Sequence, residues 1–171
     1  PEAFRDFALR AARPLAWSAT ALVGAGLAVA LLLAPTNLAQ GDALRIATIH
    51  YPAAWVALGA YVAIGALSAV TLRYRSRLTA TLAGALAPTA MLFTLLALWT
   101  QALWLKPVRG IWWVWNAEAV SQLMLLFLLG GFIALRFAID DPRRADRACA
   151  LLALIGLDTM PVLCVSMIWF D

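Results

Sequence analysis

Apolar runs of about 20 residues recur along this chain, and they constrain its fold more than any other feature of the sequence. A helix needs about 20 predominantly apolar residues to cross the hydrocarbon core of a bilayer. Hydrophobic residues make up 64% of the sequence and charged residues 13%, so the chain is more apolar than a typical soluble domain. The sequence therefore predicts an all-α, polytopic membrane protein.

The apolar runs predict about five transmembrane helices, which we treat as one transmembrane domain covering residues 1–171. Residues 1–14 are amphipathic and are expected to form an interfacial helix on the positive side of the membrane. Pro52 is placed in the first turn of the second span, where its missing N–H breaks no hydrogen bond. The predicted spans are residues 15–35, about 50–72, about 82–104, about 120–138 and about 148–169, and polar connections are expected at 36–48 and 106–118.

Basic residues gather at alternate ends of the predicted spans. The positive-inside rule therefore places the N-terminus in the cytoplasm and the connection 106–118 on the periplasmic side. The charges form no continuous basic face, which argues against a nucleic-acid partner. Of the thirteen basic residues, ten lie on the cytoplasmic side (Arg5, Arg10, Arg13, Arg73, Arg75, Arg77, Arg136, Arg143, Arg144 and Arg147) and three on the other (Arg45, Lys106 and Arg109).

Three of the eight tryptophans, Trp112, Trp113 and Trp115, fall within four positions of the connection 106–118. Tryptophan gathers at membrane interfaces because its ring prefers an apolar setting while its indole N–H needs a partner. Such a density is typical of either an interfacial girdle or a flat aromatic platform that stacks on a large planar ring. The sequence alone does not separate these two interpretations.

The same connection carries residues suited to a ligand. Gly110 permits a close approach of the backbone. Arg109 and Lys106 could pair with the carboxylates of a ligand, or they could anchor the helix end at the membrane surface.

His50 is the only histidine, and the predicted topology places it on the same side as the tryptophans. It could cap the second span or lie in the headgroup zone, or it could ligate a metal as a neutral imidazole. One histidine cannot build a zinc site, but one protein ligand can suffice for haem iron. His50 is therefore the candidate metal ligand.

Other polar residues in the spans give weaker signals. Asp158 lies inside the fifth span, where a charge costs about 2.5 kcal/mol or more, so it is expected to be paired, functional or neutral. Cys149 and Cys164 are expected to be small core residues. No phosphate loop, zinc motif or nucleophile elbow is visible, so we do not expect an enzyme.

Two motifs resemble the cytochrome c-type biogenesis haem-handling proteins, specifically the haem exporter protein C family of cytochrome c maturation system I. Residues 106–117 match the family's signature Trp-Gly-x-Trp-Trp-x-Trp-Asp and its preceding Lys-Pro without a gap. Residues 49–55, Ile-His-Tyr-Pro-Ala-Ala-Trp, match the opening of the family's second span, and Gln40-Gly41 and Arg45-Ile46 precede them in similar register. The resemblance covers about residues 15–171.

The resemblance implies a multi-pass protein of the bacterial inner membrane that holds haem at the outer face. In the family two histidines ligate the iron, and His50 matches the first; Trp112, Trp113 and Trp115 match the platform. The resemblance also implies a membrane complex with ABC transporter subunits, a small single-span subunit and a haem chaperone.

This chain departs from the family pattern at several positions. Arg109 stands where the family has its first signature tryptophan, Asn116 where it has aspartate, and Glu118-Ala119-Val120 where it has Arg-Leu-Thr. The family's sixth helix and second ligand histidine have no counterpart before Asp171, while Cys164 occupies the slot of an occasional histidine.

Two main hypotheses remain. In the first, the chain is a shortened and diverged haem-handling protein with His50 as axial ligand and Arg109 as a propionate partner. In the second, it has lost haem ligation and serves as a structural subunit of a larger membrane complex. A small-molecule transporter is a weaker third interpretation, because no inverted repeat is visible.

Overall fold

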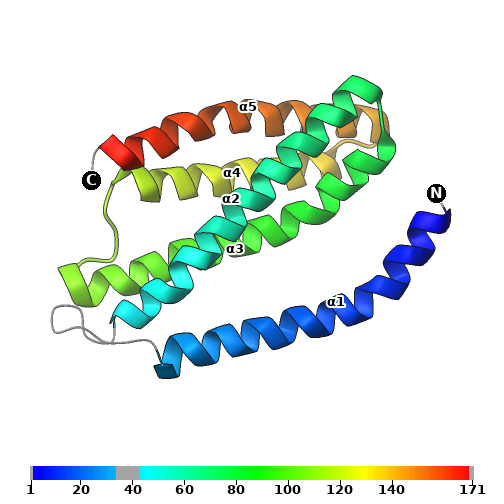
Figure 1. The fold of residues 1–171 in the computed structure, drawn as a ribbon. Coiled ribbons are helices and arrows are strands. Elements are labelled where there is room, and N and C mark those ends of the chain that lie inside the picture. Colours follow the sequence, from blue (N-terminus) through cyan, green and yellow to red (C-terminus); the bar gives the residue numbers. More distant parts are fainter. Residues whose placement is uncertain (1, 34–42, 170–171) are drawn as a thin grey trace.

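The computed structural model describes the backbone of residues 2–33 and 43–169 and the side chains of residues 5–32 and 45–157. Within these residues every regular element is helical (Figure 1), which confirms the all-α prediction. The elements are α1 (Glu2–Ala28) with the π-helical turn η1 (Val29–Leu33), α2 (Ala43–Tyr74), α3 (Arg77–Arg109), α4 (Ala117–Ala138) and α5 (Pro142–Trp169). Among the described residues, the segments Arg5–Leu32, Arg45–Tyr74, Arg77–Arg109 and Ala117–Ala138 are long and apolar enough to cross a membrane.

The helices extend further than the sequence predicted. The tryptophan connection shrinks to residues 110–116, because Lys106 and Arg109 belong to α3 and Glu118 belongs to α4. Pro52 lies well inside α2, so its placement in the first turn was wrong, and its missing N–H leaves one backbone bond of that helix unmade. Long apolar sequence on both sides lets a helix continue past such a residue.

Residues 2–14 form no separate segment, since α1 runs from Glu2 through Pro14 to Ala28. The location of this segment at the membrane interface stays a prediction. Figure 1 shows α1 bending in its N-terminal part, as expected of a helix with an internal proline. Between residues 5 and 32 only Ala30 is buried, and the turn η1 at the C-terminal end of this helix packs against α2. Toward its N-terminus α1 diverges from the other helices (Figure 1).

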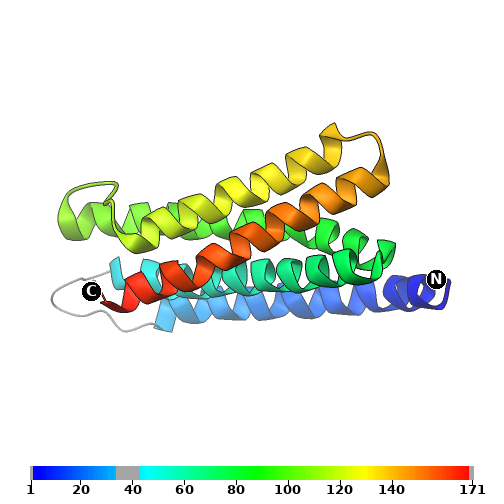
Figure 2. The same ribbon diagram turned by 90° about the horizontal axis from the view of Figure 1, so that it is seen from above.

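The pairing of α2 with α3 is the most extensive helix contact. Both helices extend along the length of the bundle (Figure 2). Buried positions recur every three or four residues along α3, and many of them are alanines that let α2 approach closely. The facing stripe of α2 has the same spacing and begins at His50, which explains why this polar residue is buried. The buried residues of α3 are Ala80, Ala83, Ala87, Ala90, Thr94, Ala97, Thr100, Gln101 and Leu105; those of α2 are His50, Ala53, Ala57, Tyr61, Ile64, Ser68 and Thr71.

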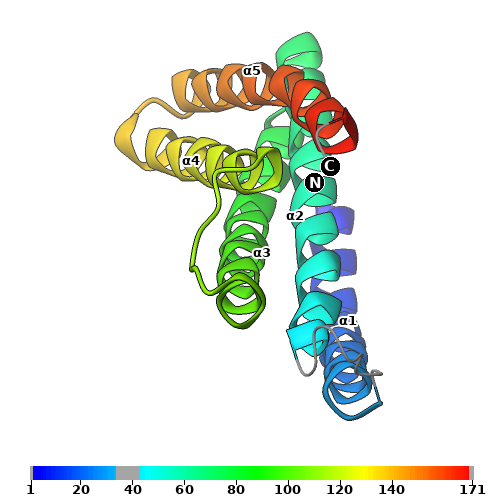
Figure 3. The ribbon, with the colours of Figure 1, turned by 90° about the vertical axis from the view of Figure 1, so that its left-hand side faces the viewer.

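The second helix pair, α4 and α5, packs across the first (Figure 3), with α4 against α3 and α5 against α2. Tyr61 of α2 donates a hydrogen bond to the carbonyl of Ala153 in α5, at 3.3 Å. A side chain on Gly156 would collide with the Tyr61 hydroxyl and with Leu128 of α4. The close approach of α5 to α2 therefore depends on a glycine at position 156.

Arg136 links α4 to both neighbouring helices. Its Nη1 donates to the carbonyl of Ala80 in α3 at 3.3 Å and to Oδ1 of Asp146 in α5 at 3.2 Å. The guanidinium passes over Gly84, where an added Cβ would lie 2.6 Å from Nε. This polar contact stabilises the arginine-rich end of the helix bundle.

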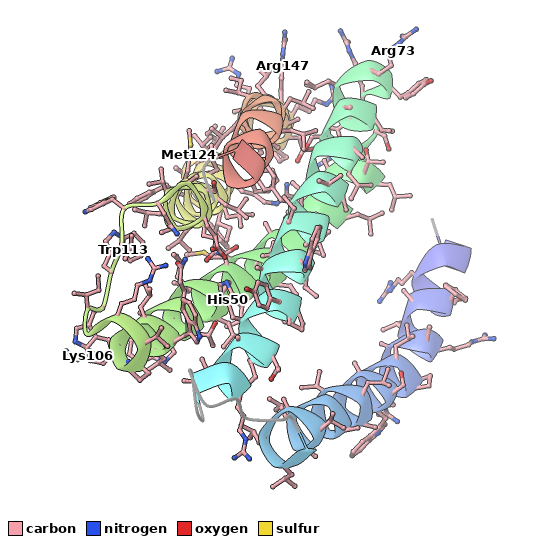
Figure 4. All side chains as sticks on the ribbon, turned by 60° about the vertical axis from the view of Figure 1, so that its left-hand side comes forward. His50, Arg73, Lys106, Trp113, Met124 and Arg147 are labelled. Atoms are coloured by element: carbon pink, nitrogen blue, oxygen red, sulfur yellow. The ribbon has the colours of Figure 1, made fainter. Side chains whose placement is uncertain are left out.

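The two ends of the bundle differ in chemistry. In Figure 4, Arg73 and Arg147 lie at one end, while His50, Lys106 and Trp113 lie toward the other. The histidine and the tryptophan connection therefore share an end, as the predicted topology required. Which side of a membrane this end faces stays a prediction.

Candidate functional site

A cavity of about 60 Å³ lies at the histidine end, between the beginnings of α2 and α4 and the end of α3. It brings together three of the predicted site residues, His50, Arg109 and Asn116, but it is not lined by Gly110 or the three clustered tryptophans. Its lining residues are Ala47, His50, Tyr51, Gln101, Trp104, Leu105, Arg109, Asn116 and Glu118.

The His50 side chain is held by the backbone of α3. Its Nδ1 lies 2.9 Å from the carbonyl oxygen of Ala97 and 3.3 Å from Oγ1 of Thr100. Because a carbonyl oxygen can only accept, Nδ1 must carry the hydrogen of this bond. His50 is 6% exposed, so it neither caps α2 nor lies free in the headgroup zone. Only Nε2 remains for another partner.

Glu118 is that partner in this structure. Its Oε1 lies 2.9 Å from Nε2 of His50, and the two side chains are 29% and 8% exposed respectively. The two atoms form a hydrogen bond that joins α2 to α4. The sequence had marked Glu118 only as a departure from the family pattern. Its position in the first turn of α4, where an acidic side chain is favoured, was the available signal.

Asn116 begins α4. Its Oδ1 accepts a hydrogen bond from the N–H of Ala119 at 2.9 Å, with extended backbone angles of −104° and 169°. This is helix N-capping, which asparagine does about as well as aspartate. Asn116 therefore stabilises the start of α4 at the edge of the cavity.

Gly110 ends α3 in the left-handed conformation, with φ of 75°, and its N–H donates to the carbonyl of Lys106 at 3.0 Å. A Cβ at this position would meet nothing within 4 Å. Glycine is thus needed here for its backbone angle, and a close backbone approach is not the reason. Lys106 Nζ donates to the carbonyl of Gly110 at 3.1 Å and lies 5.5 Å from the ring centre of Trp112.

The three clustered tryptophans do not share one plane. The rings of Trp113 and Trp115 lie 5.5 Å apart at an angle of 78°, which is an edge-to-face contact. The predicted flat platform is therefore wrong for this pair. Trp112 and Trp115 are 55% and 76% exposed, whereas Trp113 is half-buried.

Several buried polar atoms lack hydrogen-bond partners among the described residues. They include the indole N–H groups of Trp104 and Trp113 and the Oε1 atoms of Gln101 and Gln122. Of these residues, Trp104 and Gln101 line the cavity. Unpartnered buried donors are costly, and a bound ligand or water commonly satisfies them. The two indole groups add donors that the sequence analysis did not assign.

The remaining predicted residues fall elsewhere. Cys149 is buried and donates to the carbonyl of Phe132 at 3.4 Å, which confirms its place in the core. The side chains of Asp158 and Cys164, and the segment holding Gln40-Gly41, lie outside the described residues. In the described part of the chain, no three His, Cys, Asp or Glu side chains gather to hold a metal ion.

The family model "Heme exporter protein C" matches residues 1–171. Among curated relatives, the "Heme exporter protein C" of Escherichia coli (strain K12) is 39% identical over 138 residues, which are 81% of this chain and 56% of that protein. The protein of the same name in Bradyrhizobium diazoefficiens is 39% identical over 163 residues, which are 94% of this chain and 62% of that protein. The relative of that name in Haemophilus influenzae is 33% identical over 150 residues, covering 88% and 61%.

This chain thus spans less than two thirds of the length of these relatives. The sequence match and the long apolar helices together identify a multi-pass protein of the bacterial inner membrane. The chain belongs to the Heme exporter protein C family.

Proposed function

We propose that this chain handles haem for cytochrome c maturation, holding it at the outer face of the inner membrane for delivery to a chaperone. The observation that carries the proposal is the fixed imidazole of His50, whose Nδ1 is bound to Ala97 and whose Nε2 faces the cavity residue Glu118. A histidine that ligates metal typically donates its other ring N–H to a backbone carbonyl or carboxylate, which fixes the ring. His50 has this arrangement.

The surrounding residues fit the chemistry of haem. The indole N–H group of Trp104, which lines the cavity, has no hydrogen-bond partner among the described residues, and Arg109 lies at the cavity edge as a cation for propionate groups. The cavity of about 60 Å³ is far smaller than the roughly 300 Å³ or more of typical cofactor pockets. The lining side chains would therefore have to move apart before His50 could ligate haem iron.

The proposed partners follow from the family alone. They are a membrane complex containing ABC transporter subunits, a small single-span subunit and a haem chaperone. The proposed orientation, with the tryptophan connection on the periplasmic side, would present the cargo to a periplasmic chaperone.

A haem titration of the purified protein tests the proposal. The protein should carry an affinity tag without histidine. His50 is its only histidine, and a polyhistidine tag would add competing imidazoles. We expect a Soret band that His50→Ala abolishes. Ser68→Ala, at an equally buried position of α2, is the matched control and should leave the band unchanged.

The same titration separates the proposal from its alternative. A structural subunit that has lost haem ligation would show no Soret band that depends on His50. The match to Heme exporter protein C along residues 1–171 favours haem handling.

A further inference from the structure

We infer that Glu118 occupies the ligating nitrogen of His50 in the haem-free protein, so that haem must displace this carboxylate to bind. Glu118 is then a positioning residue that weakens the hold on haem. The inference rests on the proposed function, since it concerns how the same histidine takes and releases its cargo.

The first step is the geometry of the imidazole. His50 has two ring nitrogens, and each lies 2.9 Å from a partner within the protein. The Nδ1 partner is the main-chain carbonyl of Ala97, inside the contact between α2 and α3, and Ala97 is fully buried. Freeing Nδ1 would require these helices to separate. Iron can therefore reach only Nε2, and Glu118 is already there.

The second step identifies which side chain moves. His50 is pinned between helices and its side chain is 8% exposed, whereas that of Glu118 is 29% exposed and extends from the first turn of α4. A change of rotamer can carry the carboxylate away while the backbone stays in place. The adjoining cavity of about 60 Å³ gives it room, since a water molecule takes up about 30 Å³ in the liquid.

The third step concerns the consequence for affinity. Nε2 would need its lone pair to ligate iron, and it cannot offer that lone pair while it is hydrogen-bonded to Glu118. Haem binding would therefore break this contact, and the proton of the hydrogen bond would leave on the Glu118 carboxyl group. A hydrogen bond to a charged group contributes enough to change a binding constant on the order of tenfold. A protein that delivers a cargo benefits from such a competing contact, because it speeds release without altering the ligand itself.

Haem titrations of Glu118 variants test the inference. Glu118→Ala should bind haem on the order of tenfold more tightly than the parent protein, with the band still dependent on His50. Glu118→Gln keeps an amide N–H that can donate to Nε2, so its affinity should fall between the two. Asp140→Ala removes an exposed carboxylate from the other end of α4 and is the matched control. Unchanged or weaker binding by Glu118→Ala would overturn the inference.

A second measurement needs no haem. Diethyl pyrocarbonate modifies imidazole nitrogens, and His50 is the only imidazole in the chain. The modification should be faster by on the order of tenfold in Glu118→Ala. A purely structural role for Glu118 would lower the melting temperature and leave the rate of modification of the folded protein unchanged.

The two proposals fail in different ways. If no protein shows a Soret band that depends on His50, the proposed function is wrong. The reactivity of His50 then decides whether Glu118 covers the nitrogen, and equal rates in parent and variants would refute that too. If the band is present and His50-dependent but Glu118→Ala does not tighten binding, only the inference about Glu118 fails.

Discussion

His50 Nδ1 and the carbonyl oxygen of Ala97 lie 2.9 Å apart, and this bond ties the candidate ligand on α2 to the backbone of α3. The side chain of Ala97 is fully buried in the same helix contact. The direction of the imidazole is therefore set by how closely α2 approaches α3. Small residues in this contact are part of the site, although they touch no ligand.

Enlarging Ala97 should therefore disturb both stability and haem binding. Ala97→Val adds two methyl groups to a closed contact, which we expect to cost about 1–3 kcal/mol of unfolding free energy. It should also weaken the haem affinity, since the imidazole loses its fixed direction. Thermal unfolding in detergent and haem titration measure the two effects. Ala85→Val, on the exposed side of α3, is the control; an equal loss there would contradict the explanation.

The cap of α4 gives a second prediction. Asn116→Ala removes the acceptor for the Ala119 N–H, which should cost about 1 kcal/mol by thermal unfolding. Asn116→Asp keeps the cap and adds a negative charge at the helix N-terminus, so we expect the stability to hold or to rise by a few tenths of a kcal/mol. A haem affinity that drops in Asn116→Asp, despite unchanged stability, would show that the amide itself contacts the cargo.

The helix content and the shared end of the candidate residues could be predicted from the sequence. Apolar runs longer than about 18 residues have few alternatives to a helix in a membrane. The order of the helices then forces His50 and the tryptophan connection to the same end, as Figure 4 shows. The exact ends of the helices were harder to predict, because polar residues such as Lys106 and Glu118 belong to helices and not to the connection between them.

The pairing of His50 with Glu118 could not be predicted from the sequence. The two residues are 68 positions apart and belong to helices whose relative rotation depends on packing throughout the bundle. The orientation of each tryptophan ring could not be predicted from the sequence either, because it depends on the backbone of residues 110–116 and on the side-chain rotamers. The sequence indicated which chemical groups are present, and tertiary packing decided which of them meet.

A third prediction concerns the contact between α2 and α5. Gly156→Ala should destabilise the protein by about 1–3 kcal/mol, because its Cβ would collide with the Tyr61 hydroxyl. Tyr61→Phe removes that oxygen and should recover part of the loss in the double variant. Gly130→Ala is the control: its Cβ would meet nothing within 4 Å, so it should be neutral or stabilising. Additive losses in the double variant would exclude Tyr61 as the cause.

A fourth prediction separates the tryptophans. Trp115→Ala removes a side chain that is 76% exposed. The unfolding free energy of the protein should therefore change by less than about 0.5 kcal/mol. If this ring contacts haem, the affinity should fall about two- to tenfold, the usual range for an aromatic stacking contact. Trp113→Ala removes a half-buried ring and should lower the melting temperature as well. Haem titration and thermal unfolding of both variants distinguish the roles; unchanged affinity in both would remove these rings from the site.

The fifth prediction tests the orientation. Ten of the thirteen basic residues should remain in the cytoplasm, because arginine-rich connections resist transfer across the membrane. In a chain whose two cysteines are replaced by alanine, single cysteines at Ile111 and Tyr74 report opposite ends, and both positions are exposed. A membrane-impermeant maleimide that crosses only the outer membrane should label Ile111→Cys in intact cells and Tyr74→Cys only after lysis. The reverse pattern would place the histidine end in the cytoplasm, where it could not deliver haem to a periplasmic chaperone, and the proposed direction of transfer would be wrong.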